Sequence, residues 1–160
     1  MTTPLKARVV LADDHALLRE AVRALFDAQP DFEVVAEVDD GAEAVQVTLR
    51  TPVDLAVLDI SMPKLTGIDA ARHITEHRPD TRVVMLTMHD SEDLLFRALK
   101  AGASGYVVKS AAGKDLIAAA RGALRGEVFL YPREMRAGRG TPRRAGRRGP
   151  PRRGPCRQPT

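Results

Sequence analysis

Five side chains suited to binding a metal ion and a phosphoryl group stand where short apolar runs of the sequence end. Asp13 and Asp14 follow the first run, Asp59 ends the third, and Thr87 and Lys109 end the fourth and fifth. Clustered carboxylates repel one another and need a cation between them. Ligands that are all oxygen favour a hard ion, Mg²⁺ over zinc. A carboxylate beside Mg²⁺, with a lysine and a hydroxyl close by, suits phosphoryl transfer with an Asp as the covalent acceptor.

Each of these residues also has an ordinary structural explanation when it is taken alone. Asp13 and Asp14 are of a type that caps helices, and Asp59 is of a type common in turns. A single lysine such as Lys109 is most often a solvated charge. We interpret His15, next to the acidic pair, as a polar residue of the first helical turn and not as a ligand. Only the joint pattern at several strand ends favours a phosphoacceptor site.

The elements that must position these residues alternate regularly along the first 134 residues. Five runs rich in Val, Ile and Leu show little alternation, which is typical of strands buried on both faces of a parallel sheet. They cover residues 8–12, 33–38, 55–58, 83–86 and 105–108. A helical pattern follows each run, and Ser91 is a candidate N-cap for the fourth helix. The sequence therefore predicts an α/β fold, a doubly wound five-stranded parallel sheet with five helices, in which ligands bind beyond the carboxyl ends of the strands.

The first predicted helix has a broad apolar stripe. The apolar positions recur at a spacing that places them on one face of a helix. They are residues 17, 18, 21, 22, 25 and 26. We therefore expect this whole stripe to pack on the sheet.

Charge divides the chain into two unequal parts. The 160 residues carry a formal net charge of +4. Residues 1–134 hold 16 Lys and Arg against all 21 acidic residues, a net charge of −5, whereas residues 135–160 hold nine Arg and no acid, a net charge of +9. In the second part 19 of 26 residues are Arg, Gly or Pro, too polar a composition to offset about 1–2 kcal/mol of backbone entropy per residue. We predict a disordered basic tail over 135–160.

Two explanations of this tail stay open. It is either an Arg-rich arm that binds nucleic acid through phosphates or the product of a shifted reading frame in a GC-rich gene. The second is favoured, because Arg, Gly, Pro and Ala have codons made only of G and C.

Several classes of protein are excluded by composition. No apolar run approaches the roughly 18 residues needed to span a bilayer, so no membrane association is expected. The single cysteine, Cys156, excludes a disulfide framework and a cysteine-based zinc cluster. A cytoplasmic location is therefore expected.

Four separated motifs resemble the receiver domain of bacterial two-component response regulators. Their residues most resemble those of the NarL/FixJ (LuxR-type) subgroup. They are VLADDHALLRE at 10–20, LDISMP at 58–63, LTMHD at 86–90 and KAGASGYVVKS at 100–110. They occur in order at the expected strand ends, and the resemblance covers about residues 7–132. It implies a flavodoxin-like, CheY-like sheet with strand order 2-1-3-4-5. The implied organisation is a receiver domain over 7–127 and the start of a linker over 128–134, followed by the tail.

The resemblance implies a role for each residue at the strand ends. Asp59 would accept a phosphoryl group from the phosphohistidine of a sensor histidine kinase. Asp14 and Asp59 would ligate Mg²⁺ with the backbone carbonyl of Ser61, and Asp13 would contribute through a water molecule. Lys109 would pair with the phosphoryl group.

The resemblance also implies a switch. Thr87 would move to hydrogen-bond the phosphoryl group, and Tyr106 would turn inward in the active state. The surface of the fourth helix, fifth strand and fifth helix would then rearrange, often to form a homodimer.

The output of the chain is the least determined part of this interpretation. Regulators of this subgroup usually continue into a helix-turn-helix domain, but no recognition helix is readable in the 26 residues after Glu134, so specific DNA binding by this chain is doubtful. The leading hypothesis is a phosphorylation-controlled switch that regulates transcription in full-length form, and the alternative is a stand-alone receiver acting through protein contacts. A Mg²⁺-dependent phosphohydrolase is disfavoured because Ser61 stands where a second acidic residue is expected. We therefore expect that the protein is not an enzyme, although as a phosphoacceptor it takes part in its own phosphorylation and dephosphorylation.

Overall fold

The apolar runs of the sequence form the strands of one parallel sheet. The computed structural model of the chain describes residues 6–88 and 91–131. The strands are β1 (Ala7–Ala12), β2 (Phe32–Val38), β3 (Leu55–Asp59), β4 (Arg82–Thr87), β5 (Gly105–Val108) and β6 (Phe129–Tyr131). All neighbours pair in parallel, in the order β2-β1-β3-β4-β5-β6. The predicted α/β fold and the predicted order of the first five strands are confirmed.

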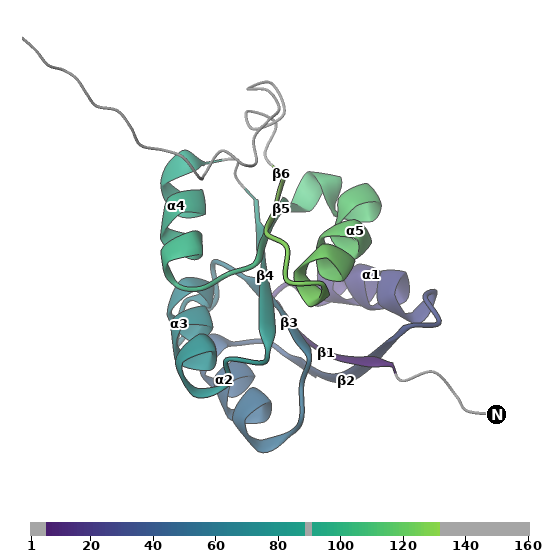
Figure 1. Cartoon of the computed structure of the whole chain (residues 1–160), viewed down its shortest axis with the longest axis horizontal. Helices are drawn as coiled ribbons and strands as arrows, with labels where there is room; N and C mark the ends of the chain where they lie inside the picture. Colours follow the sequence, from purple (N-terminus) through teal and green to yellow (C-terminus); the bar gives the residue numbers. More distant parts are fainter. Residues whose placement is uncertain (1–5, 89–90, 132–160) are drawn as a thin grey trace, which may run out of the picture.

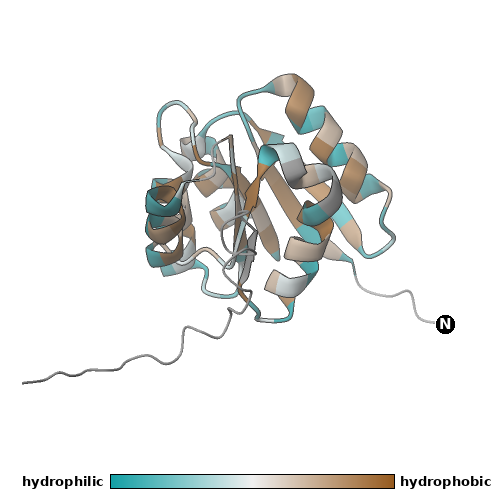
Figure 2. Ribbon diagram, turned by 90° about the horizontal axis from the view of Figure 1, so that it is seen from above, coloured by the Kyte–Doolittle hydropathy of each residue, from teal (hydrophilic) through white to brown (hydrophobic). Residues whose placement is uncertain are grey.

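The five predicted helices cover both faces of this sheet. They are α1 (Ala16–Asp27), α2 (Gly41–Arg50), α3 (Gly67–His77), α4 (Glu92–Lys100) and α5 (Ala112–Leu124), with a short 3₁₀ helix, η1 (Lys109–Ala111), before the last. Helices α1 and α5 bury their apolar residues against one face, and α2, α3 and α4 cover the other (Figure 1). Figure 2 shows the apolar strands between the helices, whose outer surfaces carry hydrophilic residues. No helix in the described ranges is long and apolar enough to cross a membrane.

The sheet has one more strand than the sequence analysis predicted. β6 pairs with β5, with Gly105 opposite Phe129 and Val107 opposite Tyr131. The sequence analysis predicts the start of a linker at these residues of β6. A three-residue strand is too short to give a periodicity signal, and α5 supplies the crossover that a parallel pair requires. The sheet therefore extends to Tyr131, beyond the expected boundary at residue 127. The predicted tail over 135–160 lies outside the described residues.

Polar side chains fix where three of the helices begin. The side chain of Asp40 accepts a hydrogen bond from the backbone N–H of Glu43 at the start of α2. Thr66 does the same at the start of α3. Ser91 accepts from the N–H of Leu94 at 3.2 Å, so the predicted N-cap of α4 is confirmed. Each cap satisfies one of the N–H groups that have no partner within a helix.

The apolar stripe of α1 is narrower than the sequence analysis predicted. Val22 and Phe26 are buried, and Leu18 and Leu25 pack partly against the same core. Leu17, however, is 81% exposed. Successive residues of a helix point about 100° apart, so Leu17 and Leu18 cannot both face the sheet. The core contacts favour Leu18.

Candidate functional site

Three strands bring a buried lysine into contact with two buried carboxylates at the carboxyl edge of the sheet. Asp13 follows β1, Asp59 ends β3 and Lys109 follows β5. The Nζ atom of Lys109 lies 3.1 Å from Oδ2 of Asp59 and 3.2 Å from Oδ2 of Asp13. The exposed fractions are only 3% for Asp13, 2% for Asp59 and 8% for Lys109. The predicted convergence of these side chains is present in the fold.

This arrangement leaves the carboxyl group of Asp59 unusually basic. The pKa of Asp59 is raised from 3.8 to about 6, mainly by burial and next by the neighbouring charge of Asp13. The ammonium group of Lys109 and the backbone N–H of Ser61 oppose the rise. One buried cation is therefore not enough to compensate two buried carboxylates.

The donor set has room for a further positive charge. Oδ2 of Asp13, Oδ2 of Asp59 and Nζ of Lys109 are all buried, and none of them has a partner with hydrogen-bond geometry in the described part of the chain. Asp14 stands at the open side of the cluster, with 37% of its side chain exposed. Carboxylate oxygens with unused lone pairs, one of them reachable from solvent, fit a hard divalent cation.

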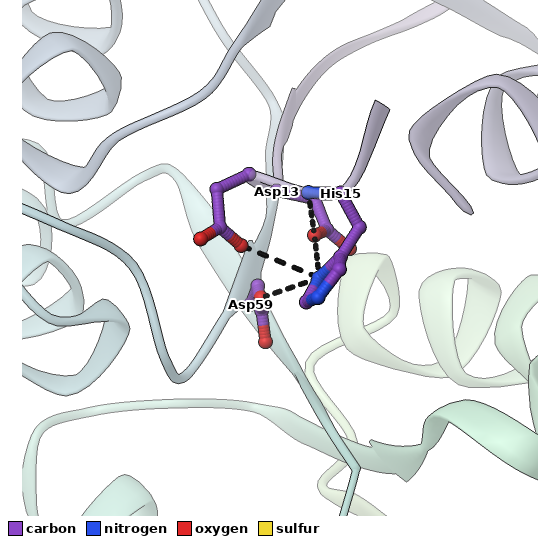
Figure 3. A group of neighbouring side chains, drawn as sticks. Asp13, His15 and Asp59 are labelled. Carbon is purple, nitrogen blue, oxygen red and sulfur yellow. Dashed lines mark hydrogen bonds and ion pairs between the residues drawn. The ribbon is translucent and has the colours of Figure 1, made fainter. Parts of the chain in front are cut away.

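His15 stands at the start of α1, close to its predicted place in the first helical turn, and its ring lies against the acidic cluster. Its Nδ1 lies 3.2 Å from Oδ1 of Asp13, 3.3 Å from Oδ1 of Asp14 and 4.0 Å from Oδ2 of Asp59. Figure 3 shows the imidazole ring pointing at the carboxylates. The four side chains offer ligand atoms that all lie within 4.8 Å of one another. The sequence signal was its position beside the acidic pair, but a histidine there is also an ordinary helix-start residue.

The acidic pair does not cap α1. The N-cap position is occupied by His15, whose side chain makes no capping hydrogen bond. Oδ1 of Asp13 instead accepts from the backbone N–H of His15 at 2.9 Å. This bond holds the Asp13 carboxylate beside the cluster and excludes the simplest structural explanation of that residue.

The two proposed switch residues lie on neighbouring strands beside the cluster. Thr87 ends β4 and is buried, and it pairs in register with Val108 of β5. Tyr106 is fully buried, and its hydroxyl donates to the carbonyl of Ser91 at 3.1 Å. Tyr106 is buried in this structure, and its inward turn on activation stays a prediction.

The loop after Asp59 is shaped by a close approach of backbone to backbone. The N–H of Gly67 donates to the carbonyl of Ile60 at 2.8 Å. A Cβ atom at position 67 would stand 2.1 Å from the carbonyl oxygen of Asp59. Only glycine lets the start of α3 approach the end of β3 this closely. Gly67 therefore helps to position the Asp59 carboxylate.

An open groove leads from this edge of the sheet towards α4. Its volume is about 570 Å³, and its lining runs from Asp14 and Ser61 to Leu94 and Arg97. Ser61 is exposed, and its backbone N–H donates to Oδ1 of Asp59 at 3.4 Å. Met88, which follows β4, is also exposed. The groove gives a small molecule or a side chain of another protein access to the open side of the acidic cluster.

A five-stranded parallel core with an acidic cluster and a lysine at its carboxyl edge is the architecture of a receiver domain, and comparison with known proteins agrees. The response regulator receiver domain family matches residues 9–121. The chain belongs to this family.

Curated proteins similar to this chain include bacterial regulators. The transcriptional regulatory protein DegU of Brevibacillus brevis is 38% identical over 128 residues, which are 80% of this chain and 54% of DegU. The oxygen regulatory protein NreC of Staphylococcus carnosus is 39% identical over 127 residues, 79% of this chain and 58% of NreC. The chain thus spans a little more than half the length of these relatives.

Solved structures show the same fold. The signal receiver domain of a NarL response regulator from Mycobacterium tuberculosis is 33% identical with a TM-score of 0.74, over 78% of this chain and all of that one. A LuxR-family two-component response regulator from Aurantimonas is 36% identical with a TM-score of 0.77, over 82% of this chain and 94% of that one. The resemblance to NarL-type receivers is therefore confirmed in sequence and in structure.

Proposed function

We propose that this chain is a phosphorylation-controlled signalling switch in which Asp59 accepts a phosphoryl group from the phosphohistidine of a sensor histidine kinase. The observation that carries the proposal is the buried contact of Asp59 with Lys109, next to Asp13. A buried carboxylate beside another carboxylate and a lysine lowers the stability of the fold, and such groups are typical of functional sites.

The transfer itself needs a nucleophile and a neutralising charge. An oxygen of the Asp59 carboxylate attacks phosphorus, the P–N bond of the donor breaks, and its electron pair stays on the imidazole nitrogen, which takes up a proton. The product is an acyl phosphate on Asp59. Because Lys109 Nζ already lies 3.1 Å from that carboxylate, it can pair with a phosphoryl oxygen without a large movement.

We assign a Mg²⁺ site to Asp14, Asp59 and the backbone carbonyl of Ser61, with Asp13 acting through a water molecule. When bound, Mg²⁺ would neutralise charge on the phosphoryl oxygens. The buried carboxylate oxygens of Asp13 and Asp59 that lack a hydrogen-bond partner support this assignment. Until the cation binds, Lys109 is the positive charge that holds the two acids together.

The switch connects the site to α4. Thr87, at the end of β4, moves to hydrogen-bond the phosphoryl group. This movement changes the packing around Tyr106, which lies on the neighbouring strand β5. The hydroxyl of Tyr106 bonds to the carbonyl of Ser91, at the N-cap of α4. A movement of either side chain therefore reaches the surface of α4, β5 and α5, where we propose that a homodimer forms.

The partner is a sensor histidine kinase, and in full-length form the output is regulation of transcription. The second of these proposals draws on relatives that are named as transcriptional regulators and are almost twice as long as the matched segment. The alternative is a receiver that acts through protein contacts alone.

The test is to incubate the chain with Mg²⁺ and acetyl phosphate and to measure its intact mass. We expect a gain of one phosphate that requires Mg²⁺ and is lost in Asp59→Asn. Asp93→Asn, at an exposed carboxylate of α4, is the matched control and keeps the gain. No gain in the unmodified chain, or a gain that survives in Asp59→Asn, overturns the proposal.

A further inference from the structure

We propose that His15 is a nitrogen ligand of the metal site and makes it select first-row transition ions, such as Mn²⁺ and Co²⁺, over Mg²⁺. The inference rests on the proposed cation site at Asp14 and Asp59. It adds to that site a ligand of different chemistry, supplied by the residue that directly precedes α1.

Three separations measured from Nδ1 of His15 are close to those between ligands of one octahedral ion, and the separation to Asp13 is also that of a hydrogen bond. Ligands about 2.1 Å from one ion lie about 3.0 Å apart when adjacent and about 4.2 Å apart when opposite. Nδ1 of His15 lies 3.2 Å from Oδ1 of Asp13 and 3.3 Å from Oδ1 of Asp14, near the adjacent spacing. It lies 4.0 Å from Oδ2 of Asp59, near the opposite spacing.

The His15 ring is available to a cation. Its side chain is 60% exposed, so a hydrated ion can reach it. The His15 side chain does not cap α1, because it makes no hydrogen bond to the backbone N–H groups at the start of this helix. Helix capping would favour Ser, Thr, Asp or Asn at this position. The structure therefore offers no reason for histidine here other than its contact with the carboxylates (Figure 3).

The cluster also has unused binding capacity. Oδ2 of Asp13 and Oδ2 of Asp59 are buried and lack a partner with hydrogen-bond geometry among the described residues. The ammonium group of Lys109 lies 3.2 and 3.1 Å from these two oxygens, but its single charge only partly compensates two carboxylates. A cation at the cluster would serve these oxygens together with the His15 nitrogen.

The chemical type of the ligand atom decides which cation binds more tightly. Mg²⁺ is a hard ion that takes oxygen ligands and gives up water reluctantly. Imidazole suits transition metals, whose affinities for a given site rise from Mn²⁺ to Co²⁺ and Ni²⁺. Loss of the imidazole should therefore weaken Co²⁺ and Mn²⁺ binding while leaving Mg²⁺ binding almost unchanged.

The test compares full-length chains in a Cys156→Ser background, which removes the single thiol as a competing ligand. Calorimetric titrations with Mg²⁺ and Co²⁺ are made on the background chain, on His15→Ala and on His73→Ala, an exposed histidine of α3. We expect His15→Ala to weaken Co²⁺ binding about tenfold or more and Mg²⁺ binding by less than about twofold. His73→Ala should change neither affinity.

Spectroscopy tests the bond directly. Electron spin echo modulation of bound Mn²⁺ should show ¹⁴N coupling from imidazole, present in His73→Ala and absent in His15→Ala. Lack of the coupling in the background chain overturns the inference, as does an unchanged Co²⁺ affinity in His15→Ala. A rise of Mg²⁺ affinity in His15→Ala also overturns it, because the ring would then be excluding the cation.

Failure of this inference can be told apart from failure of the proposed function. The mass gain from acetyl phosphate in Mg²⁺ is measured on the same chains. If it occurs normally while His15 has no effect on Co²⁺ binding, only the metal selectivity is wrong. If it fails in the background chain, the phosphoacceptor proposal is wrong.

Discussion

Nζ of Lys109 lies 3.1 Å from Oδ2 of Asp59, and both residues are buried. The same ammonium group is shared with Asp13 at 3.2 Å. The fold thus holds two buried negative charges against one positive charge. This imbalance is the physical property from which the first two predictions follow.

The first prediction concerns Asp59 and pH. Its pKa is raised to about 6 from 3.8, so the folded chain binds a proton at Asp59 more tightly than the unfolded chain does. Stability from this group is present below about pH 4 and is lost as the pH rises through about 6. Neutral Asn avoids that loss. At pH 7 Asp59→Asn should therefore raise the unfolding free energy of the metal-free chain by up to about 3 kcal/mol, at about 1.4 kcal/mol per pKa unit.

This prediction is checked by urea unfolding between pH 4.5 and 7.5. The advantage of Asp59→Asn over the unmodified chain should grow as the pH rises to about 6 and then level off. Mg²⁺ should raise the melting temperature of the unmodified chain and not that of the variant. A variant less stable than the unmodified chain at pH 7 would show that the raised pKa has another origin.

The second prediction concerns Lys109. Lys109→Gln removes the ammonium group between Asp13 and Asp59, and breaking a buried ion pair on one side typically costs about 3–5 kcal/mol. Metal-free stability should fall by about that amount, and Mg²⁺ should recover part of it. Lys64→Gln is the matched control, because the Lys64 side chain is exposed and its ion pair with Asp40 is worth at most about 1 kcal/mol. Equal losses in the two variants would contradict the prediction.

The third prediction concerns Gly67. In Gly67→Ala the new Cβ would stand 2.1 Å from the carbonyl oxygen of Asp59, so β3 or α3 must shift. We expect a loss of about 2–3 kcal/mol and a weaker rise of melting temperature with Mg²⁺, since Asp59 is displaced. Gly113→Ala, with open space around its Cβ, should be neutral or more stable by up to about 1 kcal/mol. Thermal unfolding with and without Mg²⁺ measures both effects.

The fourth prediction concerns Tyr106. Tyr106→Phe keeps the buried ring and removes the hydroxyl that donates to the carbonyl of Ser91. Loss of this bond should cost about 1 kcal/mol and speed amide hydrogen exchange at the start of α4. Phosphorylation of Asp59 should be retained, since the substitution leaves Asp13, Asp59 and Lys109 in place. Unchanged exchange in α4 would separate Tyr106 from the switch.

Much of the fold could be predicted because it depends on local patterns. Runs of Val, Ile and Leu that are buried on both faces mark parallel strands wherever they occur, and the five runs correspond to β1 to β5. Ser91 caps α4 as predicted because capping involves only the next three residues. β6 was missed because its three residues carry no pattern and pair with β5 across the whole of α5.

The sequence by itself determined which residues could form the site. Asp13, Asp59 and Lys109 each follow or end a predicted strand, and the carboxyl ends of parallel strands share one edge of a sheet. Their meeting could therefore be predicted from their order along the chain.

Only the tertiary structure decided how these residues behave. The raised pKa of Asp59 comes from burial and from the charge of Asp13, and burial is a property of the packed molecule. The approach of His15 to Asp59 and the shared contact of Lys109 with Asp13 and Asp59 depend on the relative placement of elements remote in sequence. Local periodicity specifies what a segment becomes, whereas side-chain direction and desolvation are set by its neighbours in space.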